Sequence, residues 1–133
     1  MESKLKHLEF IQAVINRLAT NSFLFKGWAV TLAAALTAVA TNESRRGLVV
    51  IAACSTALFW LIDGIYLSLE RRYRELYDEV AGKDENQIDF SMKIGTDKQA
   101  RRWLAAFVSR TLLLFYGAVL FLSTMSIFLA RSK

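Results

Sequence analysis

The sequence predicts an all-α membrane protein with an N-terminal amphipathic helix, three transmembrane helices and a helical cytosolic extension of the second span. Two observations support this fold class. The first is a set of three apolar stretches, at residues 23–41, 47–69 and 103–130, each close to or above the roughly 20 residues that a helix needs to cross a bilayer. The second is the absence of proline, so that no helix in the chain is forced to kink or stop.

Residues 1–22 are expected to form a cytosolic amphipathic helix. Apolar side chains recur there at every third or fourth position, which is the spacing of one helix face. They are Leu5, Leu8, Ile11, Ile15 and Leu18. Either Asn21 or Ser22 is then placed to cap a new helix that begins the first span.

Residues 23–69 are expected to form a transmembrane hairpin with spans at 23–41 and 47–69. Only residues 42–46 connect the two spans, and a connection this short makes them antiparallel neighbours. Ala29, Ala33, Thr37 and Thr41 recur every four residues in the first span. Small side chains at this spacing let helix backbones approach closely in lipid.

Residues 70–102 are expected to form a cytosolic helix and loop. The second span continues as a helix to about Val80, because apolar side chains between positions 69 and 80 keep one helical face. Opposite charges four residues apart support the same helix. The expected pairs are Arg71 with Glu75 and Arg74 with Asp78. Gly82 is a natural stop.

Residues 103–133 are expected to form the third transmembrane helix and a short outer tail. The segment Thr96-Asp97-Lys98-Gln99 has the pattern of a capping box and is interpreted as the start of this helix. Residues 111–130 carry no charged side chain. This is the clearest of the three predicted spans.

Strict alternation of apolar and polar residues marks positions 88–94. Such alternation is typical of a strand, but no partner strand is readable in the chain. One interpretation is an extended loop that holds Phe90 and Met92 against the cytosolic helices. The other is pairing with a neighbouring subunit, which makes Phe90 and Met92 oligomer contacts.

The distribution of Lys and Arg predicts a cytoplasmic N-terminus and a periplasmic C-terminus. Cytoplasmic flanks of membrane proteins carry an excess of these residues. With the N-terminus inside, twelve Lys and Arg residues lie on the cytoplasmic side and four outside. The four are Arg45, Arg46, Arg131 and Lys133.

No motif for catalysis, metal binding or cofactor binding is found in the sequence. The chain has one cysteine, Cys54, and one histidine, His7, which excludes an internal disulfide and a Cys/His metal cluster within one chain. His7 is interpreted as a solvated or interfacial side chain, because nothing near it in the sequence supplies a second catalytic role. We expect neither an enzyme nor a cofactor.

Asp63 is the most informative polar residue, because it lies inside an apolar stretch about two turns from its cytosolic end. An ionised carboxylate at this depth must be paired or hydrated. Lys26 and Arg110 lie at a similar depth in the other two spans, so we expect the three to form an intramembrane polar cluster. If residues 103–110 lie outside the hydrocarbon, Arg110 is instead at the membrane boundary. The cluster is either a neutralising clamp between helices or the lining of a water-filled path or ligand pocket.

A second candidate site is a group of cations next to the predicted membrane surface, which we call the basic collar. The acidic residues of the same segment are concentrated farther from the membrane. The collar consists of Arg71, Arg72, Arg74, Lys98, Arg101 and Arg102. It is expected to bind lipid headgroups or, repeated around an oligomer, a polyanion such as an oligonucleotide.

Four segments carry a family resemblance, at residues 10–18 (FIQAVINRL), 21–28 (NSFLFKGW), 59–64 (FWLIDG) and 70–74 (ERRYR). With them the chain resembles small three-span membrane proteins of bacterial anti-phage defence, and among these the channel effectors of Hailong systems. The resemblance implies a homo-oligomeric pore in the bacterial inner membrane. It also implies a closed state held by oligodeoxyadenylate, which a partner nucleotidyltransferase makes, and depolarisation of the membrane when infection removes that signal.

The expected function is therefore an oligonucleotide-gated ion channel effector, assembled as a homo-oligomer, with a tetramer as the expected assembly. Three spans with hardly any outer domain suit such a channel, because one subunit cannot enclose much of a pore. The alternative is a non-conducting scaffold or accessory subunit that recruits a cytosolic partner to the membrane. A proton-coupled exporter that uses Asp63 is disfavoured, because the chain has no internal repeat.

Overall fold

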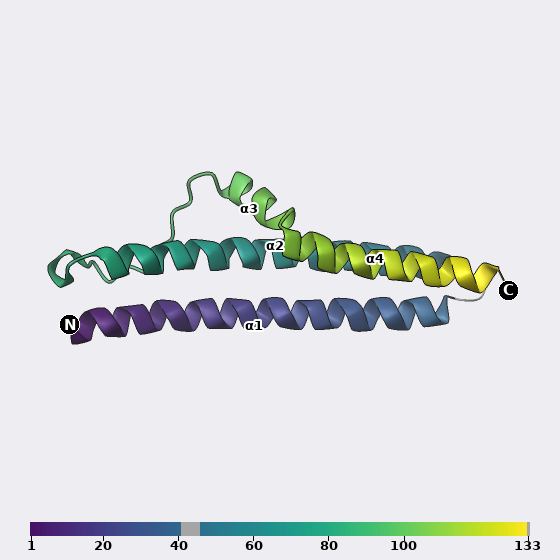
Figure 1. Ribbon diagram of the computed structural model, residues 1–133, viewed down its shortest axis with the longest axis horizontal. Coiled ribbons are helices and arrows are strands. Elements are labelled where there is room, and N and C mark those ends of the chain that lie inside the picture. The colour runs from purple at the N-terminus through teal and green to yellow at the C-terminus, as the bar shows by residue number, and fades with distance from the viewer. Residues whose placement is uncertain (41–45, 133) are drawn as a thin grey trace.

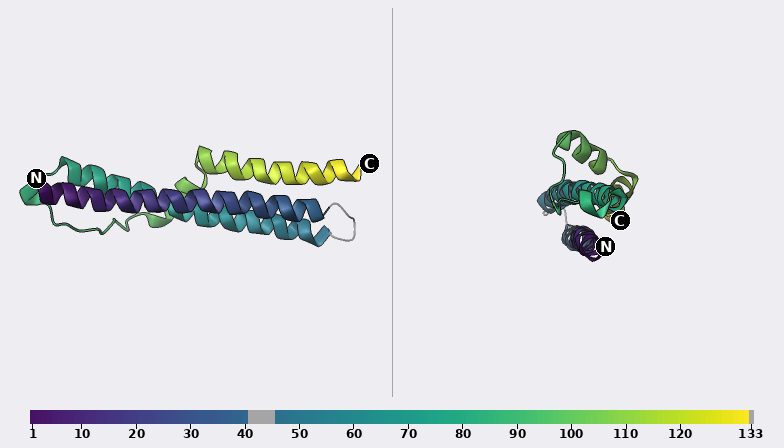
Figure 2. Two further views of the ribbon diagram at one scale, coloured as in Figure 1. Left: turned by 90° about the horizontal axis from the view of Figure 1, so that it is seen from below. Right: turned by 90° about the vertical axis from the view of Figure 1, so that its left-hand side faces the viewer.

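The computed structural model describes residues 1–40 and 46–132 and, over these residues, is a helical protein without strands. Two long helices, α1 (Glu2–Val39) and α2 (Arg46–Gly82), run antiparallel and side by side along the molecule (Figures 1 and 2). A short 3₁₀ turn, η2 (Glu85–Gln87), follows α2. Two further helices, α3 (Gln99–Phe107) and α4 (Arg110–Arg131), complete the fold.

Among the described residues, three helices are long and apolar enough to cross a membrane, namely α1, α2 and α4, as the three predicted spans require. A helix of 38 residues, the length of α1, extends about 57 Å, nearly twice the roughly 30 Å of a bilayer core. Only part of the hairpin formed by α1 and α2 therefore fits inside a membrane. The prediction of an all-α membrane protein with a helical extension of the second span is confirmed: α2 continues to Gly82.

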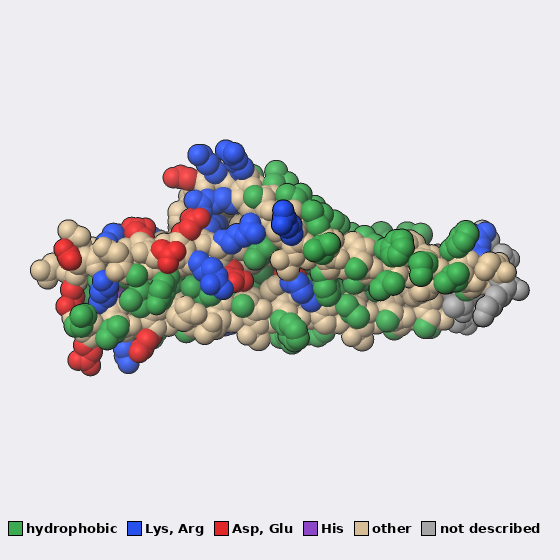
Figure 3. Space-filling view, viewed as in Figure 1, with side chains coloured by type: hydrophobic (Ala, Val, Ile, Leu, Met, Phe, Trp, Pro, Cys, Tyr) green, Lys and Arg blue, Asp and Glu red, His purple; other side chains and the backbone are tan. Residues whose placement is uncertain are grey.

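The molecule divides lengthwise into two halves (Figure 3). We call residues 2–22 and 70–107 the charged half, because most of the Lys, Arg, Asp and Glu side chains lie there. We call residues 23–39, 47–69 and 110–131 the apolar half. Each half has its own core: Ile11, Ile15 and Val80 in the charged half, and Ala29, Leu112 and Tyr116 in the apolar half.

The expected boundary between an amphipathic helix and the first span does not exist, since α1 is one continuous helix through Asn21 and Ser22. Neither residue is an N-cap. The Ser22 hydroxyl instead donates a hydrogen bond to Asp63 on α2. A buried carboxylate needs donors, and this need explains why a residue with cap chemistry lies in the middle of a helix.

The third helix is broken, contrary to the prediction of one helix entering the span at residue 103. α3 ends at Phe107, and α4 begins at Arg110 with Ser109 as its N-cap, whose Oγ accepts from the Leu112 amide at 3.4 Å. The predicted capping box at residues 96–99 does not form either. Lys98 is the N-cap of α3, in the left-handed region and without a side-chain cap bond.

Aromatic packing holds the break between α3 and α4 against α2. The Trp60 indole donates to the Phe107 carbonyl at 3.0 Å, and its ring stacks on that of Phe107 at 4.5 Å. Gly64 lies opposite, where a Cβ atom would approach the Trp103 Nε1 to 3.4 Å. The bond to Trp60 satisfies a carbonyl at a helix end that would otherwise lack a partner.

The ion pairs of the charged half differ from those predicted. Arg74 pairs with Glu70 at 2.8 Å rather than with Asp78. Glu75 pairs with Arg102 of α3 at 2.6 Å rather than with Arg71. Glu75 therefore links α2 to α3, which a prediction limited to pairs within one helix could not include.

Residues 88–94 form no strand with any described residue. Met92 packs on the core of the charged half. Phe90 is half exposed, has a φ of 55°, and lies 5.5 Å from the His7 ring. His7 is buried, so it is not the solvated side chain considered above, and its Nε2 lies 3.2 Å from the Ser91 carbonyl oxygen. These contacts favour the interpretation of an extended loop held against the helices.

Candidate functional site

The candidate site is centred on Asp63, which lies in the apolar half and is fully buried. Its Oδ1 accepts from the Ser22 hydroxyl. Its Oδ2 accepts from the Lys26 ammonium at 2.5 Å and from the Tyr116 hydroxyl at 3.0 Å. Donors from α1 and α4 therefore meet a carboxylate on α2, so that the site joins all three apolar helices.

The helix geometry explains why these side chains meet. Ser22 and Lys26 are four residues apart on α1 and thus share a face, and the Lys26 Nζ also donates to the Ser22 Oγ at 2.8 Å. Tyr116 is fully buried in α4, and its ring stacks on that of Trp60 at 6.0 Å. The Phe115 ring centroid lies 6.0 Å from the Lys26 Nζ. Aromatic rings thus exclude solvent from the polar group.

Each oxygen of the Asp63 carboxylate has a donor, and one of these donors carries a full positive charge. Such pairing is what allows a carboxylate to remain inside an apolar helix bundle. Breaking it would leave a buried charge without a partner. The arrangement therefore matches the neutralising clamp among the two predicted roles of the cluster.

Arg110 does not join this cluster. It is the first residue of α4, its side chain is exposed, and no ion pair to it is found among the described residues. The predicted convergence is therefore wrong for Arg110 and right for Lys26 and Asp63. Sequence reasoning missed Ser22 and Tyr116 as donors to Asp63. The spacing of Ser22 and Lys26 was a usable signal for the first, whereas nothing local indicated the second.

The basic collar does not remain a set of six free cations. Arg72 is buried and donates to the Gly95 carbonyl, while Arg74 and Arg102 are the partners of Glu70 and Glu75. Arg71, Lys98 and Arg101 are exposed and have no ion pair among the residues that the structure describes. These three are therefore the collar residues available to an anion.

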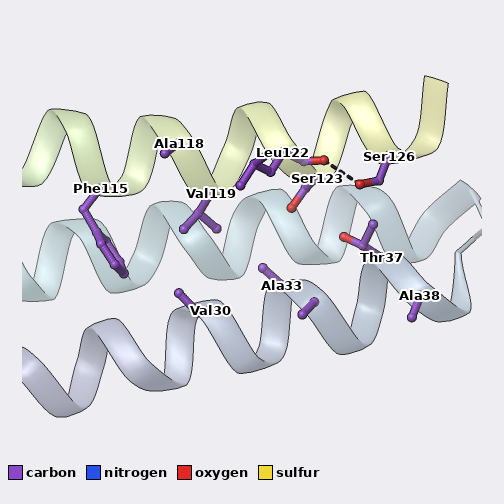
Figure 4. Close-up of a pocket in the computed structure, with 11 residues that line it drawn as sticks. Val30, Ala33, Thr37, Ala38, Phe115, Ala118, Val119, Leu122, Ser123 and Ser126 are labelled. Atoms are coloured by element: carbon purple, nitrogen blue, oxygen red, sulfur yellow. Dashed lines mark hydrogen bonds between the residues drawn. The ribbon is translucent and has the colours of Figure 1, made fainter. Parts of the chain in front are cut away.

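A groove of about 570 Å³ opens between α1 and α4 in the apolar half (Figure 4). Most of its lining is apolar, with small side chains such as Ala33 and Ala118. Three hydroxyl residues also line it: Thr37, Ser123 and Ser126. The groove shows that α4 packs less closely against α1 toward the C-terminal end of the bundle than it does near Tyr116.

Comparison with known proteins adds no relative. No family model, no curated protein and no solved structure matches the chain.

Proposed function

We propose that the protein is the subunit of a homo-oligomeric membrane channel that acts as an effector in bacterial anti-phage defence. The observation that supports it is the groove between α1 and α4, which brings the hydroxyl residues Ser123 and Ser126 to an open side of an otherwise apolar bundle. Three helices are too few to enclose a pore. Several copies whose grooves face a common axis would line a shared path with Ser123 and Ser126.

The gating part of the proposal assigns an oligonucleotide such as oligodeoxyadenylate to the collar. It is supported by the family resemblance and by the exposed, unpaired cations Arg71, Lys98 and Arg101. Phosphate oxygens are natural partners for such a group. In this proposal the charged half faces the cytoplasm, where the oligonucleotide is made, and the chain lies in the inner membrane as a tetramer.

Ion flux through liposomes that contain only the purified protein tests conduction. The groove variant Ser126→Trp places a bulky ring on the proposed path, and the matched control Leu114→Trp places the same ring where the side chain is already 74% exposed. We expect flux from the wild type and from Leu114→Trp, and its loss in Ser126→Trp. Absence of flux from an intact wild-type oligomer would contradict the channel.

Binding of oligodeoxyadenylate tests the gating site. The triple variant Arg71→Gln/Lys98→Gln/Arg101→Gln should lose binding, and its affinity should depend less steeply on salt, since each phosphate contact releases counterions. The control is Lys4→Gln/Lys6→Gln/Lys93→Gln, which removes the same charge elsewhere in the charged half. Equal binding by both triple variants would move the site away from the collar.

Cysteine labelling tests the orientation of the chain in the membrane. In a Cys54→Ser background, Lys133→Cys should react with a membrane-impermeant reagent added to intact cells, and Ser3→Cys should not. The reverse pattern would contradict the proposed topology.

A non-conducting membrane scaffold is the second candidate function, and the Asp63 site favours it. Lys26 neutralises Asp63 within one subunit, so this pair offers no free charge to a passing ion. A scaffold would give no flux in the liposome experiment while still holding a cytosolic partner. Phe90, half exposed beside His7, is then available for that partner or, in the channel, for a neighbouring subunit.

A further inference from the structure

A second, smaller cavity lies where α1, α2 and α4 meet in the apolar half. Its volume is about 20 Å³. Hydroxyl side chains from all three helices line it: Thr37 from α1, Thr56 from α2, and Ser123 and Thr124 from α4. Small hydroxyl residues are common where membrane helices pack, but a buried hydroxyl still needs a hydrogen-bond partner.

The Thr37 hydroxyl has no hydrogen-bond partner although it is buried. The residue is only 9% exposed, and its Oγ1 has no donor or acceptor within reach. In a helix most threonine hydroxyls bond to the carbonyl four residues earlier, as Thr31 does to Gly27 at 2.9 Å. Thr37 does not, so its hydroxyl carries the free-energy penalty of an unsatisfied buried polar group.

The Ser123 hydroxyl faces Thr37 from the other side of the gap (Figure 4). No described residue forms a hydrogen bond with it. The two hydroxyls point toward the same space from α1 and α4, but they do not bond to each other directly. A single molecule that both donates and accepts would bond to both hydroxyls.

We propose that one water molecule occupies this cavity and bridges Thr37 and Ser123. A cavity of about 10–15 Å³ or more holds a single water when two to four polar groups surround it, and the observed volume of about 20 Å³ suits one molecule. Thr56 supplies a third partner. Its Oγ1 donates to the Ala52 carbonyl at 2.8 Å and retains lone pairs that accept from the water.

Thr37 and Ser123 line both this cavity and the larger groove. The cavity lies two helical turns from the Asp63 site, since Thr56 and Ser123 are each seven residues from Asp63 and Tyr116, about 10 Å along a helix. The bundle thus has two polar sites along its length. At one, Lys26 pairs with Asp63, and at the other, water bridges Thr37 and Ser123. The water site belongs to a single copy of the chain and does not depend on conduction.

Water-edited solid-state NMR of the full chain in bilayers, with labelled threonine, tests the proposal directly. Magnetisation from water should reach Thr37 faster than Thr31, which lies on the same helix and has a satisfied hydroxyl. The Ser123→Ala variant should slow the transfer to Thr37 and leave Thr31 unchanged. Transfer to Thr37 no faster than to Thr31 would overturn the proposal.

Thermal unfolding in detergent gives a second test. The direction in which Thr37→Val shifts the unfolding midpoint distinguishes a cavity that holds water from an empty one. In a dry cavity Thr37→Val replaces an unsatisfied hydroxyl with a methyl group of the same shape and raises the midpoint. With bound water the variant loses a bridge and the midpoint falls. Adding Ser123→Ala should then lower it by less than the sum of the single effects, because one water serves both. A raised or unchanged midpoint, or additive losses, would overturn the proposal.

Discussion

The two halves of the molecule place most of their charged groups differently, although α1 and α2 run through both. The charged half buries Ile11, Ile15 and Val80 and leaves most of its ionised groups exposed. The apolar half buries an ion pair, Lys26 with Asp63, and exposes Leu114 and Phe128, at 74% and 73%. The difference follows from the solvent that each half meets.

Burying apolar surface lowers the free energy in water. It does not do so in lipid, because lipid tails are as apolar as leucine. In the charged half, apolar packing can therefore hold the helices together. In the apolar half, close packing of small residues and hydrogen bonds between helices must do so. The Asp63 site provides such bonds from α1 and α4 at once. We therefore expect stability to depend most on buried polar side chains in the apolar half and on buried apolar side chains in the charged half.

The largest expected effect is that of Lys26→Met, which removes the charged partner of a buried carboxylate. We expect a loss of about 3–5 kcal/mol in the free energy of unfolding, measured by denaturant titration in detergent micelles. The matched control is Lys83→Met, whose exposed pair with Glu79, at 2.5 Å, is screened by solvent and is expected to change the stability little.

A double variant tests whether the loss of stability in Lys26→Met comes from the unpaired Asp63 carboxylate. Lys26→Met/Asp63→Leu removes both partners and should recover most of the lost stability, because replacing a buried pair with apolar side chains is often neutral. If the double variant is as unstable as Lys26→Met, the cause is not the unpaired carboxylate.

The next effect is that of Ile11→Ala in the charged half, where the side chain is fully buried. The variant removes buried apolar atoms and leaves a cavity, which should lower the free energy of unfolding by about 2–5 kcal/mol. The control Leu5→Ala, at a side chain that is 55% exposed, should stay within about 0.5 kcal/mol of the wild type. Membrane insertion should be unchanged in both, and a failure of Ile11→Ala to insert would show that the halves do not act separately.

A smaller effect is expected for Tyr116→Phe, which removes one neutral donor from Asp63 and leaves the ion pair in place. A hydrogen bond to a charged group contributes about 1.5–3 kcal/mol. Tyr66→Phe is the matched control, since the Tyr66 ring packs on Phe25 at 5.1 Å and its hydroxyl donates to no described residue. Equal stabilities of the two variants would remove Tyr116 from the polar site.

Features of the fold and of the site that depend on local sequence patterns could be predicted. Periodicity predicted the continuation of α2 to Gly82, because one apolar face persists there. Depth counting predicted that Lys26 would meet Asp63. It failed for Arg110 because the count assumed an unbroken helix, whereas the break at Val108 and Ser109 makes Arg110 the exposed first residue of α4.

Features that depend on tertiary contacts could not be predicted. The break between α3 and α4 is held by the Trp60 indole, which is 47 residues away in the sequence from Phe107. Arg72 belonged to the predicted collar by charge, but its guanidinium is buried against the Gly95 carbonyl. No local pattern distinguishes it from Arg71. Which collar residues remain without an ion pair depends on these long-range bonds and could not be predicted from the sequence.

The smallest expected effect concerns the end of the charged half, where the N-terminal ammonium and the Ser3 hydroxyl donate to Glu85. These bonds lower the pKa of Glu85 below its ordinary value of 4.5, with the N-terminal bond as the larger cause. A group whose pKa is lowered by folding stabilises the folded state above its unfolded pKa, and that stability is lost as the pH falls through the folded pKa.

The contact should therefore be intact at neutral pH and should weaken only below about pH 4.5, near the ordinary pKa of the group. The ¹³C shift of the Glu85 carboxyl, followed by NMR from pH 7 downward, measures its titration. Acetylation of the N-terminus removes the ammonium, so the pKa of Glu85 should rise toward 4.5 in the acetylated protein. The amide of Leu5, which bonds to the Met1 carbonyl at 3.1 Å, should then exchange faster. A Glu85 pKa that is the same with and without acetylation would show that the end of α1 is not held by this pair.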